Sequence, residues 1–134
     1  MRYIAISQSE IQEIKRLHES VLSKSSGGLF YSIGRKFGRD MVKEIQDRDR
    51  FFEEAARILK DRNVVEDIFF DEKTVTVKGS IEVRKENHPT CDVLRGVLQA
   101  LYRAYYGKKV YCEEIQCEST GADKCIFEMK EEVI

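Results

Sequence analysis

The most informative stretch of this sequence is EIQCESTGADKC, residues 114–125. It contains Glu114, Cys117 and Cys125 in the pattern E-x2-C-x7-C, and a further cysteine, Cys91, lies upstream. Thiolate and carboxylate ligands in fourfold number suit zinc, which prefers tetrahedral sites and accepts mixed sulfur and oxygen donors. The pattern therefore suggests a metal site formed by these four residues.

The spacing raises a geometric objection to a single site. Residues three apart on a regular strand point to opposite faces of the sheet, so Glu114 and Cys117 need a bulge or a turn between them. Cys112 shares the strand face of Glu114 and is therefore a reserve ligand. From the residues alone, buried thiols without a metal and a disulfide remain alternatives to the metal site.

A metal bound by these residues would have a structural role. Three thiolates and a carboxylate complete a tetrahedron, so they leave no position for a catalytic water. Their summed negative charge exceeds the charge of a divalent ion, so the closed site would repel an anionic ligand. Such a site would fix the start of a helix at Cys91 to the end of a sheet.

The composition is that of a globular protein. The chain has 134 residues, 42% of them hydrophobic and 35% charged, which fits a single domain over residues 1–134. A net charge of −1 argues against a protein whose main role is to bind nucleic-acid phosphates. No apolar run reaches the roughly 20 residues of a membrane span, and residues 1–7 are too short and polar for a signal peptide. We therefore expect a cytoplasmic protein with reduced cysteines, which favours metal binding over disulfides.

The N-terminal half of the chain reads as helices. Ser7 and Glu10 form a capping box, and Gly27 and Gly28 are expected to stop the helix that follows it. The apolar residues that predict the buried face of this helix are Ile11, Ile14, Leu17, Val21 and Leu22.

A second helix contains two glycines, Gly34 and Gly38, one turn apart on the same strip. Because glycine is unfavourable inside a helix, this pair predicts close backbone packing within the fold or across a dimer, with a ligand contact as the alternative. A third helix is expected over about residues 50–62, started by Asp49. The apolar residues of the second helix are Leu29, Phe30, Ile33, Phe37, Met41 and Ile45.

The C-terminal half reads as strands interrupted by one helix. Residues 64–70 and 74–77 predict a hairpin, and residues 81–83 continue the alternation of apolar residues after Gly79, a possible bulge position. The only proline, Pro89, suits the first turn of a helix over about 90–106.

The buried face of that helix and its end can also be read from the sequence. Gly107 is expected to end the helix, and residues 108–116 and 124–130 are expected to form a final antiparallel pair. The apolar residues that predict the buried face of the helix are Val93, Leu94, Val97, Leu98, Leu101 and Tyr105.

The sequence resembles the 4-vinyl-reductase domain family. Residues 91–96, CDVLRG, supply the family's cysteine at a helix start and the glycine on that helix, and residues 110–127 supply its E-x2-C-x3-G-x3-C-x-F hairpin. Gly28, Tyr31, Gly34 and Gly38 are similar to the weaker N-terminal pattern of the family. In the family's phenol-sensing regulators a zinc is bound at the motif positions. The resemblance therefore implies a structural zinc with the ligands Cys91, Glu114, Cys117 and Cys125.

The resemblance also implies a fold. It predicts an α+β domain in which a helical N-terminal layer packs on a twisted antiparallel sheet, as in TRAPP trafficking subunits and haem-based nitric-oxide sensors. Domains of this type often dimerise through their N-terminal helices, so a homodimer is expected. The order of helices and strands derived above is compatible with this fold.

Several other residues are candidates for ligand binding. Tyr102, Tyr105 and Tyr106 cluster near the end of the fourth helix, and His88 precedes the proline close to Cys91. They are candidate ligand-binding residues, although core packing of the tyrosines and a surface position of His88 are the simpler interpretations.

Two features on the N-terminal helices are interpreted as solvated surface. His18 lies beside the apolar strip of the first helix and is expected to face solvent. The second helix has a basic face for which binding of an anionic group is the alternative, formed by Arg35, Lys36, Arg39 and Lys43.

The sequence carries no enzyme signature that we recognise. It has no glycine-rich phosphate loop and no dinucleotide fingerprint, and neither histidine lies beside a plausible nucleophile. We therefore expect a non-enzymatic, zinc-stabilised domain that binds or senses a small, hydrophobic molecule and acts through a separate protein partner, without direct nucleic-acid binding or membrane insertion. The alternatives are a protein-assembly adaptor of TRAPP-like fold and an accessory subunit in tetrapyrrole or other cofactor metabolism.

Overall fold

The computed structural model describes residues 2–22 and 25–132, and the side chains of residues 21–27, including Val21 and Leu22, lie outside what it describes. Within the described residues, no helix has the length and apolar character needed to cross a bilayer. The helices are α1 (Gln8–Leu22), α2 (Ser25–Val42), the 3-10 helix η1 (Arg48–Arg50), α3 (Phe51–Asp61), α4 (Asp92–Tyr106) and the 3-10 helix η2 (Glu118–Thr120). The strands are β1 (Asp67–Phe70), β2 (Thr74–Lys78), β3 (Val110–Gln116) and β4 (Cys125–Glu131).

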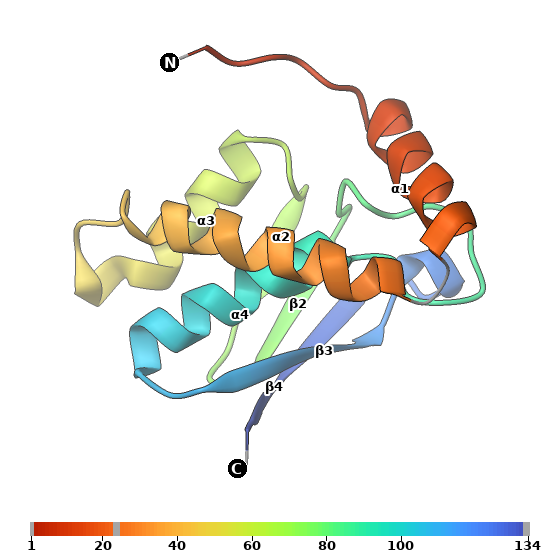
Figure 1. Cartoon of the computed structure of the whole chain (residues 1–134). Coiled ribbons are helices and arrows are strands. Elements are labelled where there is room, and N and C mark those ends of the chain that lie inside the picture. The colour runs from red at the N-terminus through yellow and green to blue at the C-terminus, as the bar shows by residue number, and fades with distance from the viewer. Residues whose placement is uncertain (1, 23–24, 133–134) are drawn as a thin grey trace.

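The four strands form one antiparallel sheet in the order β1-β2-β4-β3. The helices α2 and α4 are stacked over one face of this sheet, with α4 between α2 and the strands (Figure 1). Side chains of α4 and the sheet form the core, where Leu98, Val75 and Phe127 are fully buried. The predicted α+β architecture, a helical layer on an antiparallel sheet, is therefore confirmed.

The structure corrects the expected start of the strand half. The first hairpin is confirmed, with β1 beginning at Asp67, but residues 81–83 form no strand. The chain leaves the sheet at Gly79, whose φ of +65° turns the backbone away from the line of β2. Residues 79–91 then run irregularly to α4, which begins at Asp92, so Pro89 precedes the helix instead of occupying its first turn. The final strand pair and the helix end at Gly107, with φ +70°, are as predicted.

The helices α2 and α4 touch through their backbones. A Cβ atom on Gly96 would overlap the carbonyl oxygen of Tyr31, and one on Gly34 would overlap that of Val93. A Cβ on Gly38 would lie 2.7 Å from the carbonyl oxygen of Val97, which is also too close. The glycines therefore allow an approach that no side chain would permit, and the close packing predicted from Gly34 and Gly38 lies within the fold.

We expect Gly96→Ala to destabilise the protein by about 2–3 kcal/mol, because the new methyl group forces α2 and α4 apart. The matched control is Gly28→Ala, since a Cβ there meets nothing within 4 Å and alanine is favoured over glycine in a helix by up to about 1 kcal/mol. Urea unfolding of both variants measures the two free energies. Equal stability of the two variants would contradict the proposed backbone contact.

The helix α1 differs from the expectation in its orientation. Its capping box is confirmed, since Ser7 N–H donates to Glu10 Oε1 and Glu10 N–H donates to Ser7 Oγ, both at 3.1 Å. The predicted buried strip is wrong, because Ile14 and Leu17 are more than half exposed and Lys15 is buried.

Three local predictions in the helical half are also corrected. His18 is half-buried, with its ring 5.2 Å from that of Phe30, because α1 turns this side toward α2. The helix stop expected at Gly27 and Gly28 is wrong, since both glycines lie inside α2. The cap before α3 is Asp47, whose carboxylate accepts the N–H of Asp49 at the start of η1.

Candidate metal centre

Four side chains from separate segments meet at one end of the sheet. Cys91 directly precedes α4, Glu114 lies on β3, Cys117 follows β3, and Cys125 begins β4. One sulfur or oxygen atom from each of these residues lies within 4.8 Å of the other three. The structure therefore brings together all four residues that the sequence singled out, in a group that is compatible with metal binding.

A bulge in β3 resolves the objection raised by the three-residue spacing. The register of β3 against β4 shifts between Glu114 and Gln116. The side chain of Ile115, between them, is half exposed. The extra residue changes the alternation of side chains, so Glu114 and Cys117 reach the same cluster.

The sulfur spacing fits a tetrahedral ion. Sγ of Cys117 and Sγ of Cys125 are 3.9 Å apart. Two thiolates on one tetrahedral zinc at a Zn–S distance of about 2.3 Å would be roughly 3.8 Å apart. All four cysteines of the chain are free thiols, which rules out the disulfide alternative in this structure. The reserve ligand Cys112 is fully buried in the core but lies outside the cluster of four.

One oxygen of Glu114 points to a missing positive partner. Its Oε1 accepts the backbone N–H of Cys91 at 3.0 Å. Its Oε2 is buried and has no hydrogen-bond partner. A buried carboxylate oxygen without a partner is unfavourable, and a cation at the centre of the cluster would satisfy it. The residues present therefore fit a metal ion with three thiolate ligands and one carboxylate ligand.

The electrostatics of the cluster support the same conclusion. Hydrogen bonds to Cys117 raise the pKa of Cys91 and the pKa of Cys125, whereas the hydrogen bonds from Cys125 and Cys91 lower the pKa of Cys117. Burial, followed by the charge of Cys117, raises the pKa of Glu114 to about 8. Without a cation the four groups thus compete for a single negative charge. A bound divalent ion would allow all of them to release their protons.

A buried carboxylate holds the start of α4, and with it Cys91, in place. Oε1 and Oε2 of Glu82 accept the backbone N–H groups of Val93 and Leu94, which begin α4, at 2.9 and 2.8 Å. Nζ of Lys15, on α1, donates to Glu82 Oε1 at 2.7 Å and to the carbonyl oxygen of Thr90. Burial raises the pKa of Glu82, and the charge of Lys15 opposes that shift. The pair therefore connects α1 to the residue next to the metal ligand Cys91.

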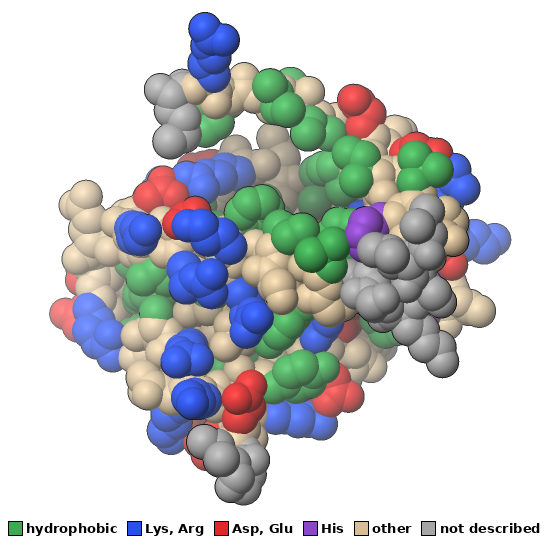
Figure 2. Space-filling model, viewed as in Figure 1, with side chains coloured by type: hydrophobic (Ala, Val, Ile, Leu, Met, Phe, Trp, Pro, Cys, Tyr) green, Lys and Arg blue, Asp and Glu red, His purple; other side chains and the backbone are tan. Residues whose placement is uncertain are grey.

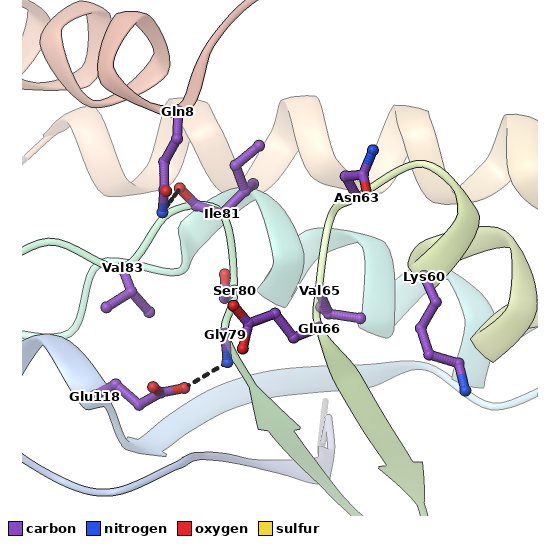
Figure 3. Close-up of a pocket in the computed structure, with 10 residues that line it drawn as sticks. All are labelled: Gln8, Lys60, Asn63, Val65, Glu66, Gly79, Ser80, Ile81, Val83 and Glu118. Carbon is purple, nitrogen blue, oxygen red and sulfur yellow. Dashed lines mark hydrogen bonds between the residues drawn. The ribbon is translucent and has the colours of Figure 1, made fainter.

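A groove lies on the other side of Cys91, between the end of α3 and the segment that follows β2 (Figure 3). Its volume is about 570 Å³. Ser80 lines it, and its Oγ accepts a hydrogen bond from Cys91 Sγ at 3.3 Å. Glu118 also lines it, with Oε1 accepting the N–H of Gly79 at 2.8 Å and lying 3.9 Å from Cys125 Sγ. The groove and the cluster of ligands therefore share a wall.

The remaining candidates from the sequence lie elsewhere. Tyr102 is buried, and Tyr105 and Tyr106 pack with it around Phe52, at ring distances between 4.9 and 6.3 Å. His88 is exposed in the segment before α4. The metal cluster contains none of these four candidates.

The sequence analysis overlooked the residues that support the cluster. Ser80 and Glu82 fall in a segment read as an alternating strand, in which Ile81 and Val83 were expected to be the buried residues. Lys15 was overlooked because the apolar spacing of α1 placed it outside the predicted strip. An acidic side chain flanked by apolar residues shortly before a helix start was the available signal for Glu82.

Comparison with known proteins supports the resemblance noted from the sequence. The sequence model of the 4-vinyl-reductase domain matches residues 74–131, which include β2, α4 and the last two strands. The uncharacterized protein MJ1460 of Methanocaldococcus jannaschii is 27% identical over 125 residues, covering 86% of this chain and 73% of that protein. The resemblance to the 4-vinyl-reductase domain family is thereby confirmed, and the chain carries a domain of this type.

Solved structures place the fold. The phenol-responsive sensory domain of the transcription activator PoxR, solved with phenol, superposes with a TM-score of 0.79 at 15% identity, covering 98% of this chain and 77% of that one. A vinyl-4-reductase family protein from M. jannaschii gives a TM-score of 0.67 at 22% identity, with 99% of both chains covered.

The fold extends to the two other classes expected from the sequence. An H-NOX protein from S. oneidensis gives a TM-score of 0.66 at 13% identity over 99% of this chain and 82% of that one. A trafficking protein particle complex subunit 3 from Naegleria fowleri, covalently bound to palmitic acid, gives 0.56 at 11% identity over 92% and 96%. At these identities the likeness concerns the fold alone.

Proposed function

We propose that this protein is a zinc-stabilised, non-enzymatic domain that binds or senses a small molecule and passes the signal to a separate protein partner. The observation that carries the proposal is the wall that the groove shares with the metal cluster. A compound in the groove would contact Ser80 and Glu118, which touch Cys91 and Cys125 in turn. The metal would hold these residues in fixed positions and so keep the groove preorganised.

The metal itself is proposed to have no part in a reaction. Three thiolates and one carboxylate satisfy a tetrahedral zinc, so the ligand set offers no open position for a water or a substrate. The ion would then connect the start of α4 with β3 and β4 as part of the architecture. A cytoplasmic setting, where thiols stay reduced, suits this ligand set.

The ligand is proposed to be a small hydrophobic molecule with a polar group. Val65, Ile81 and Val83 supply apolar surface to the groove, and Gln8 and Asn63 supply amides at its edge (Figure 3). The sensory domain of PoxR binds phenol and the trafficking subunit carries palmitic acid, so small, largely apolar ligands occur on this fold.

The groove is a better candidate than the tyrosine cluster. Tyr102 and Tyr106 border a recess of about 60 Å³. Ligand pockets usually exceed about 300 Å³, which the groove beside the cluster does and this recess does not. We therefore assign Tyr102, Tyr105, Tyr106 and His88 no more than a secondary role in ligand binding.

A homodimer formed through the N-terminal helices is part of the proposal. Apolar side chains are exposed along α1 and α2, including Ile14, Leu17, Leu29 and Phe37 at 44–55% exposure. Figure 2 shows apolar side chains gathered over these two helices on one face of the molecule. A second copy that packs on this face would bury them, and light scattering after gel filtration measures the resulting mass.

We expect phenol or palmitic acid to bind the purified protein, and Ile81→Trp to weaken binding about tenfold or more by filling the groove. Native mass spectrometry of freshly purified protein and calorimetric titration measure co-purified and added ligand. The matched control is Phe69→Trp, because Phe69 is two-thirds exposed on β1 and does not line the groove. Failure of every hydrophobic compound to bind, or equal weakening in both variants, would contradict the groove assignment.

A further inference from the structure

A second groove, between α2 and α4, is lined by three arginines and no acidic residue. Its volume is about 500 Å³. Arg35 and Arg39 lie one turn apart on α2, and Arg103 comes from α4. Figure 2 shows Lys and Arg side chains gathered over the part of the surface where α2 and α4 lie in Figure 1. The residues that complete the lining are Gln99, Ala100 and Ala104.

The backbone contact of the two helices explains why the arginines converge. Because Gly34 and Gly96 let the helices touch, residues one turn further along each helix flank the same narrow surface. Ala100 and Ala104 present only methyl groups there, which leaves space between the longer side chains. The guanidinium groups of Arg39 and Arg103 therefore reach one groove from opposite helices.

The three arginines lack the partners that other arginines of this chain have. Arg50 pairs with Glu53, and Arg62 pairs with Glu44. Across residues 2–22 and 25–132, no ion pair to a carboxylate is seen for Arg35, Arg39 or Arg103. Nε of Arg35 is in addition buried without a hydrogen-bond partner. Three like charges in one groove repel one another, and a buried donor without an acceptor is unfavourable, so the arrangement calls for an anion.

We propose that this groove binds a phosphate group. Guanidinium groups donate pairs of hydrogen bonds in a fork that matches the oxygens of phosphate. Three positive charges also suit a doubly charged phosphate better than a single carboxylate. The phosphate group belongs to a soluble metabolite or to a lipid headgroup, which present the same chemistry to the arginines. This site lies on α2 and α4, away from the groove beside the metal cluster, and is independent of the function proposed above.

Calorimetric titration of the full chain with inorganic pyrophosphate, against sodium chloride at matched ionic strength, tests the proposal. The test variant is Arg39→Gln/Arg103→Gln, since both side chains are exposed and neither belongs to the core. The control variant is Lys36→Gln/Lys43→Gln, which removes the same amount of charge but lies outside the groove. We expect the wild type and the control to bind pyrophosphate, and the test variant to bind at least about tenfold more weakly, since hydrogen bonds to charged groups each contribute at this level.

Sedimentation with vesicles distinguishes the two sources of phosphate. Vesicles of phosphatidic acid in phosphatidylcholine are compared with phosphatidylcholine alone. Sedimentation that is lost in the test variant and kept in the control assigns the phosphate to a lipid, and binding of pyrophosphate alone assigns it to a soluble compound. The proposal is overturned if neither probe binds the wild type, or if the two double variants are weakened equally.

Discussion

Cys117→Ser is expected to lose the bound metal and to destabilise the protein by about 4 kcal/mol or more, because structural zinc contributes its binding energy directly to folding. In zinc-finger peptides that contribution is on the order of 10 kcal/mol, and it should be smaller here, since the chain has a core of its own. A loss of this size lowers the melting temperature of a domain of this length by roughly 15 °C. Elemental analysis of the purified protein and thermal unfolding measure the two effects. Cys125→Ser is expected to behave in the same way.

Cys112→Ser is the matched control for the ligand assignment. Cys112 is as buried as the proposed ligands but lies outside the cluster, so the variant should keep its full metal content. Its stability should fall by only about 1–2 kcal/mol, the effect of a hydroxyl group in an apolar site. A chelator applied to the wild type should reproduce the melting temperature of Cys117→Ser. Metal-free wild type that melts no earlier than the loaded protein, or metal released by Cys112→Ser, would refute the assignment.

Lys15→Met is expected to destabilise the protein by about 3–5 kcal/mol, the usual effect of removing one partner from a buried ion pair. The side chains of Lys15 and Glu82 are only 3% and 4% exposed. Without Lys15 the carboxylate of Glu82 would stay buried without its neutralising partner, at the point where it caps α4. Chemical denaturation measures the free energy of unfolding. The metal content should stay closer to that of the wild type than in Cys117→Ser, because Cys91 itself is unchanged.

A double-mutant cycle separates this ion pair from simple loss of packing. Glu82→Gln alone should also be strongly destabilising, whereas Lys15→Met/Glu82→Gln should be less destabilised than the sum of the two single variants. Lys36→Met serves as the control, since Lys36 pairs with Asp40 on the exposed face of α2 and such pairs contribute little. Additive effects of the two buried substitutions would show that Lys15 and Glu82 are not coupled.

The candidate site was largely predictable because its residue types are unusual. Three cysteines and a glutamate in the E-x2-C-x7-C pattern with an upstream cysteine have few other interpretations in a reduced setting. What the pattern left open was whether Glu114 and Cys117 face the same way. That depends on the bulge near Ile115, which forms through pairing with β4 and carries no clear local sequence signal.

The first helix was predicted in position but not in orientation. Its capping box is a local interaction between Ser7 and Glu10, so the sequence was sufficient to place the start. Which side faces inward depends on partners distant in the sequence. Lys15 is drawn into the interior by Glu82 and the carbonyl oxygen of Thr90, and the apolar Ile14 and Leu17 are left exposed. Apolar periodicity cannot detect an inward-facing cation whose partner lies on another segment.

Local chemistry in the sequence was therefore enough to establish the α+β class, the hairpins, the glycine contact between α2 and α4, and the four candidate metal ligands. Each depends on residue types and spacings that act over a few positions of the chain. The tertiary structure alone decided the grouping of the ligand atoms, the groove behind Cys91 and the convergence of Arg39 and Arg103. These features arise where segments distant in sequence pack together, and the free energy of that packing belongs to the whole fold.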